Sequence, residues 1–110
     1  MKKIDIKVKK SAKGDYLEGD FFIKALSFNE LVALQEKLGG DGGEARMVQA
    51  CLVDANGDNV FKAQQINIIG DRMIGGDMVM CVMDAMHINR IGKIGELAES
   101  YSKNSESDQA

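Results

Sequence analysis

Six consecutive apolar residues near the C-terminal end limit the folds open to this chain more than any other feature. Residues 78–83 read Met-Val-Met-Cys-Val-Met, and the stretch from Gly76 to Ile88 around them is predicted to be a helix. A helix that is apolar on every side is either buried within its own domain or covered by a partner. A domain of 110 residues can hardly bury every side of one helix, so we expect part of this surface to meet another chain.

The N-terminal residues follow a different period. Residues 3–9 alternate between apolar and charged side chains, which is typical of a half-buried strand. A turn is predicted at residues 11–15, and an extended run follows over residues 16–25, where Gly19 is expected to mark a bulge or bend. Residues 1–25 are therefore expected to form a β-hairpin. Because a lone hairpin is only marginally stable, helices or strands from another copy must pack against it.

Short helices are predicted over most of the remaining chain. Ser27 and Glu30 form a capping-box pattern, and the helix that they begin is expected to end at Gly39 and Gly40. Residues 44–53 predict a second helix, although its β-rich end could instead be a strand. The further predicted elements are a turn over residues 54–59, a short helix over 63–69 ending at Gly70, the apolar helix, and a helical continuation through Ile91, Ile94 and Leu97.

These patterns together predict an α+β fold, with an N-terminal β-hairpin followed by a mainly helical part of four or five short helices. The length of the chain favours a single domain, expected over residues 1–99. Within it, residues 1–25 supply the hairpin and residues 26–99 the helical part. Residues 100–110 are polar and charged and are expected to be a disordered tail.

Groups that could carry chemistry are sparse. Asp54, Asn56 and Asp58 have the spacing that opens a calcium loop, but Asn59 stands at the glycine position and Gln65 at the position of the bidentate Glu. Plain turns have the same composition, and a turn is the favoured interpretation. The single histidine, His87, lies three residues after Asp84 with no recognisable nucleophile or oxyanion loop. We therefore expect no enzymatic activity, no metal and no cofactor.

Cys51 and Cys81 are each flanked by apolar residues and are expected to be buried, reduced side chains. Met1 to Lys3 lead straight into the alternating strand pattern without an apolar signal region. No segment is apolar enough to span a bilayer. These observations favour a cytoplasmic protein that does not enter membranes.

The charge pattern disfavours binding to nucleic acids. The chain has a net charge of −3, whereas DNA- and RNA-binding domains usually carry a basic patch. The one candidate patch is a group of N-terminal lysines with few aromatic residues among them to stack on bases: Lys2, Lys3, Lys7, Lys9, Lys10 and Lys13.

A cluster of methionines is the one functional hint among the residues. Five of the seven methionines fall between Met73 and Met86. Flexible, polarizable side chains suit a groove that accepts helices of varied sequence, but they also fill ordinary cores. Both interpretations stay open at this point. If the segment is an interface, the residues expected to contact a client or a second copy are Met78, Val79, Met83 and Met86.

From Leu26 to about Leu97 the order of features resembles the tail assembly chaperones of long-tailed phages. Those proteins have an N-terminal β portion, a capped helix, an apolar helix that runs into a turn of the form Val-Asp-x-x-Gly-x-x-x-Phe, and two further helices closing on an Ile/Leu-Asn step. Here the turn is residues 53–61 and the closing step is Ile88-Asn89. This chain departs from the pattern at Val60, where the family often has Leu after Pro, and in its glycines at 75 and 76.

The resemblance implies a non-enzymatic chaperone that binds the tape measure protein and keeps it soluble while the tail forms. It also implies a cytoplasmic protein, absent from the mature virion, that forms a homo-oligomer. Some members have a longer, frameshifted form that recruits the tail tube protein, and Lys103-Asn104 is compatible with such a site. The alternative interpretations are a structural tail tube or completion protein and a small regulatory or nucleic-acid-binding module.

Overall fold

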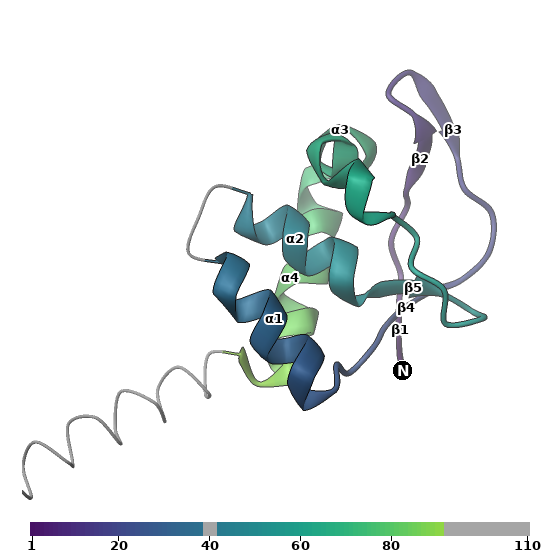
Figure 1. Ribbon diagram of the computed structural model, residues 1–110. Coiled ribbons are helices and arrows are strands. Elements are labelled where there is room, and N and C mark those ends of the chain that lie inside the picture. Colours follow the sequence, from purple (N-terminus) through teal and green to yellow (C-terminus); the bar gives the residue numbers. More distant parts are fainter. Residues whose placement is uncertain (39–41, 92–110) are drawn as a thin grey trace, which may run out of the picture.

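The fold is α+β, as predicted, and its described part combines five short strands with five helical segments (Figure 1). The structure is a computed structural model that describes residues 1–38 and 42–91. The elements are β1 (Lys2–Ile4), β2 (Lys9–Ser11), β3 (Gly14–Tyr16), β4 (Phe21–Ile23), α1 (Phe28–Leu38), α2 (Gly43–Cys51), β5 (Leu52–Asp54), the 3₁₀ helix η1 (Ala63–Ile68), α3 (Ile69–Arg72) and α4 (Gly75–Asn89).

The predicted N-terminal hairpin is present, but it is built from two separate pairs of strands. β1 pairs with β4 and β2 pairs with β3, both antiparallel. The strand expected over residues 3–9 is interrupted, because the chain turns here from the sheet towards the helices. The Lys7 amide donates to Asp77 Oδ2 at 2.9 Å, and Val8 forms an isolated bridge with Met73. These two contacts tie the middle of the hairpin to α3 and α4.

β5 resolves the ambiguity at the end of the second predicted helix. α2 ends at Cys51, and the next three residues form a strand that pairs with β4. The strand order of the sheet is β1-β4-β5, with Phe22 opposite Val53. Leu52 and Val53 are both fully buried. The third strand and the covering helices supply the support that a lone hairpin lacks.

The predicted turn after this strand is confirmed as an Asx turn. Asp54 Oδ1 accepts hydrogen bonds from the amides of Asn56 at 2.9 Å and Asp58 at 3.0 Å. Gly57 has a φ of 85°, which glycine adopts without steric cost. The carboxylate of Asp54, the first residue of the calcium-like pattern, is therefore hydrogen-bonded to backbone amides of its own loop.

The predicted capping box at the start of α1 is also confirmed. The Ser27 amide donates to Glu30 Oε1 at 3.1 Å, and the Glu30 amide donates to Ser27 Oγ at 3.2 Å. The hydrogen bonds from Ser27, followed by the charge of Lys24, hold the pKa of Glu30 below its usual range. Leu31 and Leu34 face the core from this helix.

One helix end differs from the predictions. The short helix expected to end at Gly70 instead continues as α3 to Arg72, because Ile69 is fully buried and holds this turn in the core. The helix predicted over residues 76–88 is confirmed as α4, which spans Gly75–Asn89, and Arg90 after it takes a left-handed conformation with a φ of 53°. The expected end of α1 at Gly39 and Gly40, the continuation from 92 onward and the polar tail lie outside the described residues.

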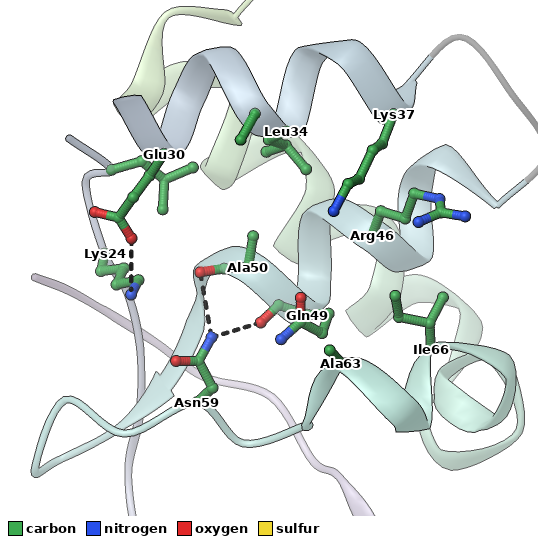
Figure 2. Close-up of a pocket in the computed structure, with 12 residues that line it drawn as sticks. Lys24, Glu30, Leu34, Lys37, Arg46, Gln49, Ala50, Asn59, Ala63 and Ile66 are labelled. Carbon is green, nitrogen blue, oxygen red and sulfur yellow. Dashed lines mark hydrogen bonds and ion pairs between the residues drawn. The ribbon is translucent and has the colours of Figure 1, made fainter. Parts of the chain in front are cut away.

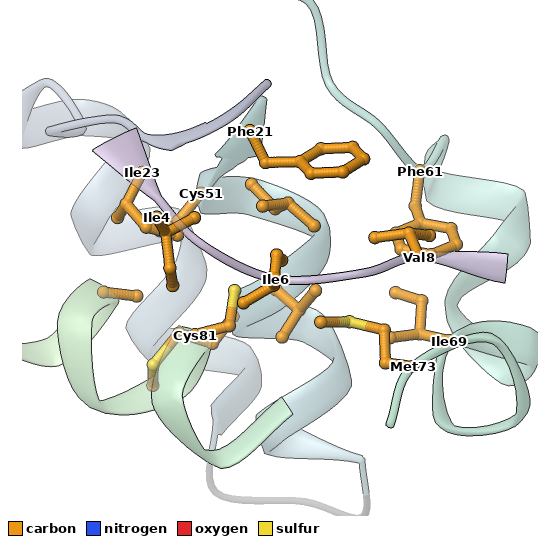
Figure 3. Packing of buried hydrophobic residues seen from close by; sticks show 14 of the residues in the cluster. Ile4, Ile6, Val8, Phe21, Ile23, Cys51, Phe61, Ile69, Met73 and Cys81 are labelled. Atoms are coloured by element: carbon orange, nitrogen blue, oxygen red, sulfur yellow. The ribbon is translucent and has the colours of Figure 1, made fainter. Parts of the chain in front are cut away.

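The core lies between the sheet and the helices that cover one side of it (Figure 3). It is filled by aliphatic side chains, two phenylalanines, two methionines and two cysteines, as Figure 3 shows around Ile6 and Cys81. Both cysteines are fully buried, as predicted. Burial raises the pKa of Cys51 to about 11 and that of Cys81 to about 12, so both thiols are neutral near pH 7.

Candidate functional site

One side of α4 is packed into the core and the other side is uncovered. Cys81 and Ala85 are fully buried, and Asn89 is nearly so. On the opposite side, Val79 is 58% exposed and Met83 is 64% exposed. The helix is therefore not enclosed in its own domain. We call its exposed apolar side chains, Val79, Met80, Met83 and Met86, the methionine face.

The four residues singled out from the sequence do not occupy equivalent positions. Val79, Met83 and Met86 belong to the methionine face, with Met86 39% exposed. Met78 is half-buried and packs against the core. Met80, which was not selected, is 44% exposed and joins the face. Helical spacing could have separated Met78 from the other three, because residues 79, 83 and 86 share one side of a helix.

A groove runs beside the methionine face, between α4 and the helices α2 and α3. Two hollows of about 330 and 300 Å³ make it up. Met78, Val82 and Met86 lie one turn apart on α4 and line these two hollows. Met73 and Met47 line it from the other elements. We call this the α4 groove.

Glu44 lines both hollows of the α4 groove. It lies in the first turn of α2, and its side chain is exposed. An otherwise apolar groove thus carries a carboxylate. Sequence reasoning missed Glu44, since a glutamate at the start of a helix is usual whatever its surroundings.

Polar contacts at three points fix α4 in place. Asp77 in its first turn accepts the Lys7 amide, and Asp84 in its middle lies 3.4 Å from Lys2 Nζ. Asn89 at its end accepts a hydrogen bond from the Leu26 amide at 2.6 Å. Its Nδ2 donates to the Lys24 carbonyl at 3.3 Å and to the Ala85 carbonyl at 3.0 Å. Asn89 is the one buried polar residue among the described positions. These contacts hold the helix with its methionine face outward.

A second hollow, of about 310 Å³, lies between α1, α2 and η1 (Figure 2). Its lining includes Lys24, Lys37 and Arg46 but only one carboxylate, Glu30. The Lys24 ammonium lies 3.6 Å from Glu30. Lys24 lies between β4 and α1, Lys37 lies on α1, and Arg46 lies on α2. The sequence did not indicate this hollow, because these cations come together only in the fold.

No catalytic arrangement is apparent in residues 1–38 and 42–91. In these ranges, no three His, Cys, Asp or Glu side chains come together as a metal site would require. Asp84 pairs with Lys2, and His87 is exposed at the end of α4. The raised pKa values of the two thiols leave neither as a ready nucleophile.

Comparison with protein-family models, with curated proteins and with solved structures gave no match. None of the helices in the described part of the chain has the length and apolar character needed to cross a membrane.

Proposed function

We propose that the chain is a tail assembly chaperone whose methionine face and α4 groove bind the helices of a tape measure protein and keep it soluble. The observation that carries this proposal is the exposure of Val79 and Met83 in the middle of an ordered helix. Contiguous exposed apolar surface on a small protein commonly marks an interaction site. The resemblance described from the sequence supplies the identity of the client.

The side chains of this surface suit a client with a repetitive but irregular sequence. Methionine has three rotatable bonds and a polarizable sulfur, so it adapts to neighbours of different shape. A tape measure protein presents long amphipathic helices, which fit a groove lined at one-turn intervals by Met78, Val82 and Met86. The chaperone therefore needs no specific side-chain match along its client.

Binding of a single copy is expected to be weak. Covering the exposed parts of Val79, Met83 and Met86 would contribute roughly 2–5 kcal/mol, since full burial of such a side chain contributes about 1.5–3 kcal/mol. The loss of translational and rotational freedom offsets much of this. Many copies along one client, or an oligomer of the chaperone, would restore affinity through avidity.

The competing interpretations receive less support from the fold. A tail tube or completion subunit needs extensive β-structure, whereas each of the five described strands has three residues. A nucleic-acid-binding module needs available cations. Of the N-terminal lysines, Lys2 pairs with Asp84 and Lys3 pairs with Asp20 at 3.5 Å.

Co-expression with the tape measure protein tests the proposal. The wild-type chain should keep the tape measure soluble and co-purify with it. Met83→Asp places a charge at the centre of the methionine face and should abolish both effects, while far-UV circular dichroism stays helical because Met83 is 64% exposed. Gln64→Asp is the matched control, since it adds the same charge at an exposed position of η1 that lines none of the hollows beside α4.

Two results would count against the proposal. If the wild-type chain neither solubilises nor retains the tape measure protein, that protein is not its client. If Met83→Asp unfolds the chain, this side chain belongs to the core and not to an interface.

A further inference from the structure

We propose that the hollow between α1, α2 and η1 is a second binding site, which takes a carboxylate carried on an apolar segment of another polypeptide. Its lining residues differ from those of the methionine face and of the two hollows of the α4 groove, so this inference does not rest on the proposed function. We call it the basic hollow. The full lining is Lys24, Leu26, Glu30, Ala33, Leu34, Lys37, Arg46, Gln49, Ala50, Asn59, Ala63 and Ile66.

The charges of the basic hollow favour an anionic ligand. Three cations and one carboxylate give its lining a charge of +2, on a chain whose net charge is −3. Glu30 is already engaged, because it accepts the Ser27 amide and lies 3.6 Å from Lys24. Among the described residues, neither Lys37 nor Arg46 takes part in an ion pair. Two cations are therefore left to meet an incoming charge.

The positions of these cations suit a ligand that enters between the two helices. Lys37 lies in the last turn of α1, and Arg46 lies on α2. Figure 2 shows both side chains at one end of the hollow, with the Lys24–Glu30 pair at the other end. An arginine guanidinium can hold a carboxylate through two parallel hydrogen bonds, and a lysine beside it adds a further charge.

The remaining lining selects a protein segment over a nucleic acid. Leu26, Leu34, Ala63 and Ile66 provide apolar contacts between the polar ends of the hollow. No aromatic side chain lines it, so bases would find no stacking partner. The amide of Asn59 is already used, since its Nδ2 donates to the Gln49 carbonyl at 2.7 Å. A glutamate or aspartate between apolar residues matches this combination of charge and apolar surface.

A titration followed by backbone amide NMR tests the site in the full chain. The probe is the peptide acetyl-Ala-Leu-Glu-Leu-Ala-amide, and its matched control carries Gln in place of Glu. The Glu peptide should give saturable shifts at Lys37, Arg46 and Ile66, and the Gln peptide should bind at least about tenfold more weakly, because charge-assisted hydrogen bonds are lost. Binding should also weaken between about 20 mM and about 300 mM salt.

Variants locate the binding. Arg46→Gln and Lys37→Gln should each weaken binding of the Glu peptide about tenfold or more, whereas Lys13→Gln at the exposed tip of the hairpin should leave it unchanged. Lys37 is exposed, so its variant should fold even if substitution of the half-buried Arg46 disturbs α2. Arg46→Lys, which keeps the charge, should retain more affinity than Arg46→Gln.

Any one of the following results would overturn the inference. They are shifts scattered over the surface without saturation, equal binding of the Glu and Gln peptides, equal weakening by Lys13→Gln, and displacement of the peptide from the same residues by a thymidine decamer. The last result would identify a phosphate site. A further arm with hexanoate separates a free carboxylate from a peptide, and tighter binding of hexanoate than of the peptide would also contradict a polypeptide ligand.

Discussion

Replacing Asn89 with alanine should destabilise the fold severely, although the side chain contacts no ligand. Asn89 joins the end of α4 to the link between β4 and α1. In Asn89→Ala the Leu26 amide loses the acceptor that lies 2.6 Å away, and the Lys24 carbonyl loses a donor. The Ala85 carbonyl keeps its helical partner, so it adds little to the cost.

The magnitude follows from the two backbone groups that lose their partners. Each buried polar group without a partner costs about 1–3 kcal/mol, and the missing side chain leaves a small void in addition. We expect Asn89→Ala to lower the free energy of unfolding by about 3–5 kcal/mol, out of the roughly 5–15 kcal/mol typical of a domain. The melting temperature should fall by more than about 10 °C.

Urea unfolding followed by far-UV circular dichroism measures this change directly. Asn67→Ala is the control, because Asn67 is exposed on η1; its effect should stay within about 0.5 kcal/mol. A loss of less than about 1 kcal/mol in Asn89→Ala would refute the account of how α4 is held.

Two further predictions concern the fold. Ser27→Ala removes the acceptor for the Glu30 amide and should cost about 1 kcal/mol, measured by the same urea titration; no change would show that the capping box is not stabilising. The raised pKa values of Cys51 and Cys81 make stability pH-dependent. An unfolded thiol ionises near pH 8.5–9, whereas the folded thiols ionise at about 11 and 12. The contribution of the two thiols to the free energy of unfolding should therefore be constant below that range, and stability should fall above about pH 9, by up to roughly 1.4 kcal/mol per thiol and pH unit. The Cys51→Ala/Cys81→Ala double variant should show a shallower fall, and an identical fall would contradict burial of the thiols.

Local signals in the sequence predicted much of the fold. The capping box, the Asx turn and the apolar helix each depend on residues close together in the chain, and each is present. The sequence did not decide between helix and strand for the third strand, because an apolar run as short as residues 52–54 is too short to show a periodicity. Its pairing with β4 depends on residues that are distant in the sequence. Val53, for example, lies opposite Phe22, which is 31 positions earlier.

The sites were harder to predict than the elements. Val79 and Met83 could be placed on one side of a helix, but which side faces the core depends on how α4 packs. The role of Asn89 and the gathering of cations in the basic hollow arise from contacts that are distant in sequence. The Asn89–Leu26 hydrogen bond, for example, spans 63 positions. No local pattern carries such information.

Methionine oxidation, followed by mass spectrometry, tests the central claim most directly. In the free chain, hydrogen peroxide should oxidise Met83, which is 64% exposed, much faster than Met47 and Met73, which are 6% and 5% exposed. In the complex with the tape measure protein, oxidation of Met83 should slow to the range of the buried methionines. If Met83 is as slow as Met47 in the free chain, or is oxidised equally fast in the complex, the methionine face is not the surface that binds the client.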